Sequence, residues 1–243
     1  MNCSSLLDQN SDLSQSTQNK KLYLKILRLL HKSNDKSLTL SSIALHLNVC
    51  NEPFALPKPI LSKDLSSFIE KYKYRFDIKE DSIQLKELAE FTTAALKSNS
   101  ISLKDFNTDS NFPGVIFIKF IGRHFPLREA SLYIDIRPII FISVVENLSV
   151  EFTDVLFSTN SELFGCLSPF FENRDQYIEW IKKNLAVTFL IEDSDYLRLN
   201  FDELMIRFSP VFNLEKNPGN LFRSIIEDKI KENAKNGKEV KSD

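Results

Sequence analysis

The segment "LSSFIEKYKYRFDIKEDSIQL", residues 65–85, limits the possible folds most, because its apolar spacing changes abruptly from helical to alternating. An apolar stripe with helical spacing predicts a helix, and alternation on both sides of a polar tip predicts a β-hairpin. The stripe and the two alternating runs consist of Leu65, Phe68 and Ile69, then Phe76 and Ile78, then Ile83 and Leu85. The sequence therefore predicts a helix that leads directly into a hairpin.

Two further helices are predicted upstream. The run "KKLYLKILRLLHK", residues 20–32, places apolar residues on one helical face and basic residues on the other. Ser41 or Ser42 is suited to cap a second helix that carries Ile43 and Leu47. Three helices followed by a hairpin is the order of a winged helix, in which the third helix is the recognition helix and the hairpin is the wing.

The second half of the chain repeats this order more loosely. An apolar segment at 139–145 precedes Leu148 and Val150, which occupy the places of Leu38 and Leu40. The run "NRDQYIEWIKKN", residues 173–184, predicts a third helix. The run "TFLIEDSDYLRL", residues 188–199, then predicts a second wing with the acidic tip "EDSD". The alternative to a duplication is that any helix followed by a hairpin produces this likeness.

We therefore predict an α+β fold of two tandem winged-helix-like units, each with three helices and a β-hairpin wing, packed through an apolar connecting segment. The predicted parts are a disordered tail (1–18), unit one (19–98), an apolar connector with a buried strand (99–127), unit two (128–209), and a C-terminal helix with a charged tail (210–243).

The sequence shows no motif for catalysis. Cys3, Cys50 and Cys166 are far apart and form no C-x-x-C pair, and neither a phosphate-binding glycine motif nor a nucleophile elbow occurs. We predict a protein that is not an enzyme and that has no cofactor, metal or small-molecule substrate. Because neither a signal-peptide pattern nor a membrane-spanning run is present, we expect a cytoplasmic location, with the nucleus as the alternative.

Charge is distributed unevenly and indicates binding. Residues 19–90 hold 13 Lys and Arg against 9 Asp and Glu, a net charge of +4, whereas residues 128–209 hold 7 against 14, a net charge of −7. Basic side chains that alternate with aromatic rings suit an RNA backbone and its bases. The predicted RNA-binding residues are Lys63, Lys71, Tyr72, Lys73, Tyr74 and Arg75.

The acidic second unit is expected to repel a polyanion and to bind a protein instead. Phe170, Phe171 and Tyr177 are predicted to be exposed anchors for that partner. Two alternatives remain open. If the basic face is only solvated, the chain is a pure protein-interaction scaffold with no nucleic-acid contact. A DNA-binding regulator is the other alternative, which the acidic second unit disfavours.

The pattern of an aromatic-Ile pair, Phe-x-Ile, an acidic turn and a closing apolar strand resembles the LOTUS domain, also called OST-HTH. "LSSFIEKYKYRFDIKEDSIQL" carries this resemblance, and "YIEWIKKNLAVTFLIEDSDYLRL" carries it more loosely. The chain also resembles the N-terminal region of egalitarian-type RNA-transport adaptors. The resemblance implies a small winged helix that binds RNA in some members and a DEAD-box RNA helicase of the Vasa type in others.

Helicase-binding members of that family carry an extra helix after the wing. "LKELAEFTTAALKSN" and "NFDELMIRF" are the segments here that match its position. The long apolar insert between the units and the short basic turn of unit two depart from the family pattern, and both weaken the expectation that unit two binds RNA.

Overall fold

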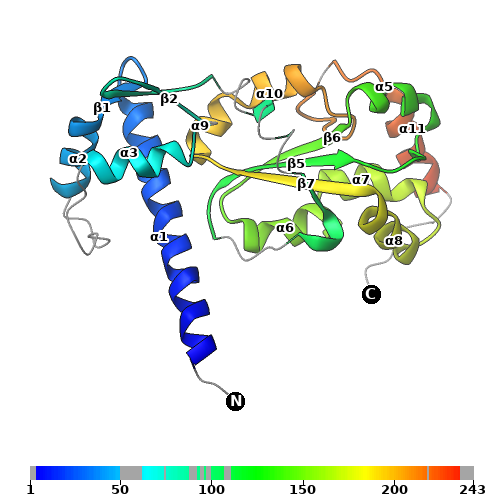
Figure 1. Cartoon of the computed structure of the whole chain (residues 1–243). Helices are drawn as coiled ribbons and strands as arrows, with labels where there is room; N and C mark the ends of the chain where they lie inside the picture. The colour runs from blue at the N-terminus through cyan, green and yellow to red at the C-terminus, as the bar shows by residue number, and fades with distance from the viewer. Residues whose placement is uncertain are drawn as a thin grey trace. The chain divides into compact units, whose positions relative to one another are not determined.

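The computed structural model has an α+β fold of two compact units, Met1–Ala94 and Ala95–Asp243 (Figure 1). It describes residues 4–49, 62–73, 75–87, 92–93, 96, 100–106, 111–217 and 219–235.

The first unit combines helices with a three-stranded antiparallel sheet. Its elements are α1 (Ser4–Lys32), β1 (Ser37–Thr39), α2 (Leu40–Val49), α3 (Ser62–Glu70), β2 (Phe76–Lys79) and β3 (Ser82–Leu85). The strand order is β1-β3-β2, so the short strand before α2 pairs with the second strand of the hairpin. The predicted helix-to-hairpin sequence is confirmed.

The amphipathic stripes predicted from the sequence form the core of this unit. Ile26 and Leu30 of α1, Leu65 and Ile69 of α3, and Ile83 of the hairpin are all fully buried. Burying a Leu or Ile side chain contributes about 1.5–3 kcal/mol to folding, so these stripes fix how the helices pack on the sheet.

The N-terminal tail differs from the prediction of disorder, because α1 begins at Ser4. Residues 4–19 are polar but contain neither proline nor glycine, the residues that most strongly interrupt a helix. The helix therefore extends from its amphipathic part, residues 20–32, toward the N-terminus.

The second unit has a four-stranded antiparallel sheet with the order β4-β7-β5-β6. The strands are β4 (Ile101–Ser102), β5 (Gly114–Phe120), β6 (Ile139–Val145) and β7 (Leu185–Ile191). The buried strand predicted in the apolar run after Pro113 is confirmed as β5, which pairs with both β6 and β7. A central strand is covered on both faces, which accounts for its unbroken run of apolar residues.

Helices cover both faces of this sheet. They are α5 (Ser131–Ile136), α6 (Leu148–Phe157), α7 (Glu162–Leu167), α8 (Arg174–Asn184), α9 (Ser194–Leu199), α10 (Phe201–Phe208) and α11 (Arg223–Lys235), with short 3₁₀ turns at Leu103–Asp105, Arg128–Ala130 and Ser168–Phe170. Figure 1 shows α6, α7 and α8 on one side of the sheet and α10 on the other. Side chains from β5, β6 and β7 form one large core with α6, α7 and α8.

The second predicted wing is wrong. Residues 194–199, expected as the return strand of a hairpin, form α9, and the acidic tip is the start of that helix. Asp193 caps it by accepting a hydrogen bond of 3.2 Å from the N–H of Tyr196. The helix buries Leu197 and leaves Leu199 85 % exposed, so two leucines that alternate along the chain lie on different helical faces.

The remaining elements of the second half also differ from those of the first. Leu148 and Val150, matched in the sequence with Leu38 and Leu40, lie in the helix α6, and the segment before them is the strand β6. The helix predicted at 173–184 is confirmed as α8, with Asn173 as its N-cap, and "NFDELMIRF" forms α10. The corresponding segment after the first hairpin lies largely outside the described residues.

Candidate functional site

Only part of the predicted RNA-binding set lies on a described surface. Lys71 and Lys73 are exposed in the turn that joins α3 to β2. Lys63 lies in the first turn of α3, but its side chain is outside the described residues, as is Tyr74. The two described lysines place positive charge between the third helix and the hairpin.

Tyr72 is packed against its own unit. Its ring stacks on Tyr23 with a centroid distance of 4.5 Å and lies 5.0 Å from the ring of Phe68. Burial raises the pKa of its hydroxyl above the usual value. Tyr72 therefore joins α1 to the turn after α3, which leaves less of its ring for stacking on a base than the sequence suggested.

Arg75 differs from the prediction, because its side chain is fully buried. Its guanidinium donates a hydrogen bond to the carbonyl of Lys86, at the end of the hairpin. The N–H of Lys86 in turn donates to the carbonyl of Arg75 at 3.0 Å. Arg75 thus ties the two ends of the hairpin together and does not present its charge to a phosphate.

The expected protein anchors of the second unit are corrected in a similar way. Tyr177 is fully buried, its hydroxyl donates to the carbonyl of Leu156 at 2.6 Å, and burial raises its pKa. Phe171 packs against Tyr177 at 5.8 Å and against Trp180 at 5.5 Å. Phe170 is half-buried against the same core. These rings stabilise the unit, and the prediction that Tyr177 is an exposed anchor is wrong.

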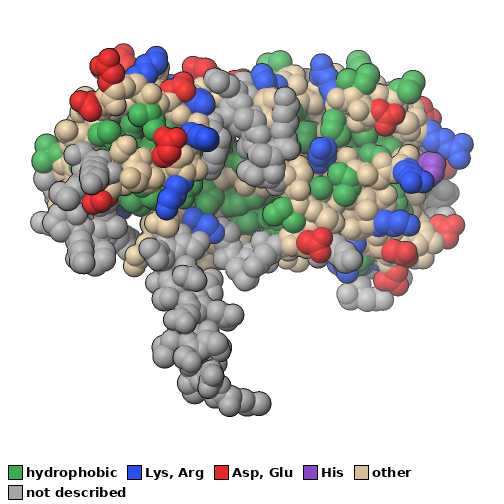
Figure 2. Space-filling model, in the orientation of Figure 1, with side chains coloured by type: hydrophobic (Ala, Val, Ile, Leu, Met, Phe, Trp, Pro, Cys, Tyr) green, Lys and Arg blue, Asp and Glu red, His purple; other side chains and the backbone are tan. Residues whose placement is uncertain are grey.

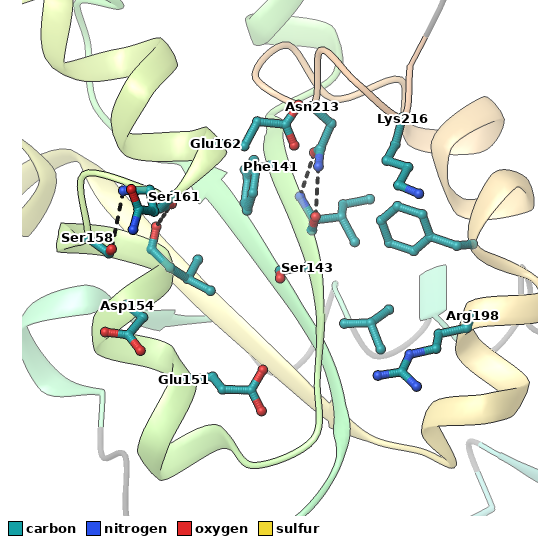
Figure 3. Close-up of a pocket in the computed structure, with 15 residues that line it drawn as sticks. Phe141, Ser143, Glu151, Asp154, Ser158, Ser161, Glu162, Arg198, Asn213 and Lys216 are labelled. Carbon is teal, nitrogen blue, oxygen red and sulfur yellow. Dashed lines mark hydrogen bonds between the residues drawn. The ribbon is translucent and has the colours of Figure 1, made fainter.

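A groove of about 840 Å³ lies along the outer edge of β6, and we call it the edge groove (Figure 3). One wall comes from α6 and the turn after it, and the other from α9, the start of α10 and the loop at 213–216. Its lining comprises Phe141, Ile142, Ser143, Val144, Glu151, Asp154, Val155, Ser158, Asn160, Ser161, Glu162, Arg198, Phe201, Asn213 and Lys216. This volume is within the range of ligand-binding clefts.

At one end of the edge groove, the side chain of Asn213 forms hydrogen bonds with the main chain of β6. The N–H of Ile142 donates to Oδ1 of Asn213, and Nδ2 of Asn213 donates to the carbonyl of Ile142, both at 2.8 Å. The N–H of Phe212 donates to the carbonyl of Ile140 at 2.9 Å. The buried amide of Asn213 therefore pairs with β6 as a peptide group of a neighbouring strand would.

Charged side chains stand on both walls. Figure 3 shows Glu151 and Asp154 on one side of β6, and Arg198 and Lys216 on the other. Glu151 accepts hydrogen bonds of 2.8 Å from the N–H groups of Glu146 and Asn147. Arg198 forms an ion pair of 2.6 Å with Glu146. Asp154 and Lys216 are exposed and form no ion pair with another described side chain, and the positive charge of Lys216 acts on the pKa of Glu162, which it lowers.

Glu162 lies at the end of the edge groove, where the loop at 213–216 holds its side chain in place. Its Oε1 accepts a hydrogen bond of 2.7 Å from the N–H of Glu215. Burial raises the pKa of this carboxyl, the negative charge of Glu215 raises it further, and the hydrogen bonds from the main chain of residues 214 and 215 oppose the shift.

A second, smaller recess of about 580 Å³ combines aromatic and basic side chains. It is lined by Gly122, Arg123, His124, Phe171, Gln176, Glu179, Trp180, Lys183 and Asn184. Figure 2 shows Lys and Arg side chains near a histidine on one part of the surface. The second unit, although its net charge is negative, therefore also has a locally basic surface. Lys183, in the last turn of α8, contributes to the charge of this recess.

Neither surface feature was predicted from the sequence. The edge groove depends on pairing between β6 and Asn213, which are 71 residues apart, and no local pattern marks that contact. For the second recess, the one local indication in the sequence is the pair Arg123 and His124, which follows an apolar strand. In the described ranges, no group of three His, Cys, Asp or Glu side chains is placed to hold a metal ion, and no helix is long and apolar enough to cross a membrane.

No family model, no curated protein and no solved structure matches this chain.

Proposed function

We propose that this protein is a non-catalytic adaptor in RNA metabolism, in which the first unit binds RNA and the second unit binds a protein. The observation that carries the proposal is the element order of the first unit. Helix, strand, two helices and a hairpin, with the strand order β1-β3-β2, is the arrangement of a winged helix. In such domains the third helix and the wing are the nucleic-acid-binding elements.

The exposed charge of the first unit supports this assignment. Lys71 and Lys73 lie between α3 and the hairpin, and Lys79 is exposed beside the hairpin tip. Phosphate contacts from such lysines supply affinity without sequence preference. Arg75 and Tyr72 position this surface from inside the unit, so the RNA contact is mainly electrostatic.

For the second unit, the edge groove supports a protein contact, because it offers main-chain groups and charged side chains along the outer edge of β6. The LOTUS-like pattern implies a DEAD-box RNA helicase as the partner class, and because residues 194–199 form α9 and no wing, that pattern rests on the first unit alone. An adaptor with these two contacts would hold an RNA beside an enzyme that remodels it.

The RNA contact is tested with a fluorescein-labelled single-stranded oligouridine and the full chain, by fluorescence anisotropy at several salt concentrations. We expect Lys71→Glu with Lys73→Glu to weaken binding at least about tenfold at low salt. The salt slope of log K should fall by about 1.4, since each phosphate contact to a single strand contributes about 0.7. The control is Lys231→Glu with Lys235→Glu, which makes the same charge change on α11.

If the wild-type chain does not bind this RNA even at low salt, the RNA half of the proposal is wrong. Equal losses in the two double variants would show that only the overall charge matters and that the first unit provides no defined surface.

The second candidate function is a pure protein-interaction scaffold. It is favoured by the burial of Arg75 and the packing of Tyr72, which reduce the predicted RNA surface. RNA binding distinguishes the two functions, because both allow a protein partner and only the adaptor binds RNA. Partners that survive nuclease treatment of the lysate, together with no binding of oligouridine by the wild-type chain at low salt, support the scaffold. Binding of oligouridine that Lys71→Glu with Lys73→Glu weakens supports the RNA adaptor.

A further inference from the structure

β6 is an edge strand, and at one of its residues the main chain has room for a further hydrogen-bonded strand. Among the described strands, in the order β4-β7-β5-β6, it pairs with β5 alone, so every second residue directs its N–H and C=O away from the sheet. Such edges readily pair with another extended chain. The way this edge is covered therefore decides whether it can bind a partner.

The register identifies the open residue. Ile142 pairs across from Phe117 and gives its N–H and C=O to Asn213, so it belongs to the outward-facing set. Val144, paired across from Val115, is two residues further and has the same orientation. Val144 lines the edge groove, and no loop or side chain within the described segments is seen to hydrogen-bond to its main chain.

We propose that an extended peptide segment of a partner protein binds in the edge groove as an added strand beside β6, with its main chain paired to Val144. Strand addition of this kind takes affinity from main-chain hydrogen bonds and specificity from alternate side chains. The inference rests on the protein-binding half of the proposed function and is independent of the RNA contact.

Charge on the two walls defines the chemistry of that peptide. Successive side chains of a strand point to opposite sides, and the exposed residues Asp154 and Lys216 stand on opposite sides of β6 (Figure 3). A matching peptide carries a basic residue toward Asp154 and an acidic residue toward Lys216, separated by an odd number of positions.

The edge groove suits a single extended chain better than a second copy of this protein. Its walls, from α6 on one side and from α9 and α10 on the other, both stand beside the edge of β6, and a volume of about 840 Å³ admits a short segment. The chain's own residues Phe212 and Asn213 already lie along this edge in that manner. A second sheet would have to bring its own flanking helices against these walls.

The test begins with a random nonapeptide library displayed on phage and selected on the immobilised full chain. The selected peptides are then synthesised with a fluorophore, and their affinities are measured by anisotropy. Val144→Pro removes the outward N–H, a change that edge strands tolerate. We expect this variant to bind the selected peptides about tenfold more weakly at an unchanged melting temperature.

Two further measurements keep the test decisive if Val144→Pro does not fold. N-methylation of the peptide should abolish binding at one position only, the residue whose N–H donates to the carbonyl of Val144, because Ile142 is already bonded to Asn213 and the N–H of Glu146 to Glu151. Exchanging the basic residue of the peptide for Glu should weaken binding to the wild type about threefold and be compensated by Asp154→Lys. Thr153→Lys is the control, because Thr153 is exposed on the same helix and does not line the edge groove.

Failure to select any peptide on the wild-type chain overturns the proposal. Peptides that tolerate N-methylation at every position, or that bind folded Val144→Pro as tightly as the wild type, overturn it as well. A dimer that this substitution dissociates would show that a second copy occupies the edge. Oligouridine binding, measured in parallel, is unaffected by any of these outcomes, so a failure here is distinct from failure of the RNA contact.

Discussion

At the scale of single residues, two side chains expected on the surface turned out to hold the interior together. Arg75 is enclosed in the first unit and Tyr177 in the second, and both give hydrogen bonds to main-chain carbonyls. A buried donor or acceptor that loses its partner costs about 1–3 kcal/mol, and more when the group is charged. Substitutions at these positions should therefore change stability before they change binding.

Arg75 should separate stability from RNA binding. Arg75→Ala removes a buried guanidinium and leaves the Lys86 carbonyl without its donor, so we expect a loss of about 1–3 kcal/mol in urea unfolding. The exposed pair Lys71→Glu, Lys73→Glu should change stability by less than about 0.5 kcal/mol. A mild effect of Arg75→Ala would mean that the guanidinium is not enclosed in solution.

Tyr177 should give the protein a characteristic alkaline response. Burial raises its pKa above 10.0 in the folded chain, whereas the unfolded chain ionises near that value. Above pH 10 the unfolded state binds fewer protons, so stability falls as pH rises. Tyr177→Phe lacks this response but also lacks the hydrogen bond to Leu156, which costs about 1–2 kcal/mol at pH 7.

The stability gap between wild type and Tyr177→Phe should therefore narrow from pH 9.5 to pH 11, as measured by urea unfolding. Cys166, whose pKa burial raises from 9.0 to about 12, destabilises both proteins equally over this range, so the comparison isolates Tyr177. A stability difference that stays constant over this pH range would contradict the raised pKa of Tyr177 in the folded chain.

At the scale of elements, the second sheet depends on close approach between β5 and β7. A Cβ at Gly114 would overlap the carbonyl oxygen of Leu190 and lie 2.7 Å from the ring of Phe189. The strands can approach this closely only because position 114 has no side chain. The edge strand β6, by contrast, is completed by a side-chain amide instead of a further strand.

A pair of glycines tests this packing. Gly114→Ala should destabilise the protein by about 1–3 kcal/mol, because main chain cannot move aside as a flexible side chain can. Gly165→Ala is the matched change within α7, where an added Cβ meets nothing within 4 Å, and should stabilise the protein by about 0.5–1 kcal/mol. Thermal unfolding of both variants checks the signs of the two changes, and equal effects would contradict the register of β5 against β7.

At the scale of the whole molecule, the two units differ in fold and in charge, so their binding activities should be separable. Lys71→Glu with Lys73→Glu should abolish most RNA binding and leave peptide binding in the edge groove unchanged, whereas Val144→Pro should do the opposite. Anisotropy with the oligouridine and with a selected peptide measures both in each variant. Loss of both activities in either variant would show that the two contacts are coupled or that the variant is unfolded.

The sequence by itself determined the elements in which apolar periodicity and turn chemistry agree. The helices of the first unit, its hairpin, the central strand β5 and the helix α8 follow from such local patterns. It failed at residues 194–199, where Leu197 and Leu199 fit a strand as well as a helix. The cap from Asp193 satisfies the first main-chain groups of a helix there, which a strand pattern does not reveal.

Only the tertiary structure decided which polar and aromatic residues are accessible. Arg75 and Tyr177 carry the residue types of binding surfaces, but their partners, Lys86 and Leu156, lie 11 and 21 positions away along the chain. The edge groove likewise exists because Asn213 reaches across 71 positions to pair with Ile142 and leaves Val144 open. Local sequence specifies the period of an element, whereas exposure depends on long-range packing.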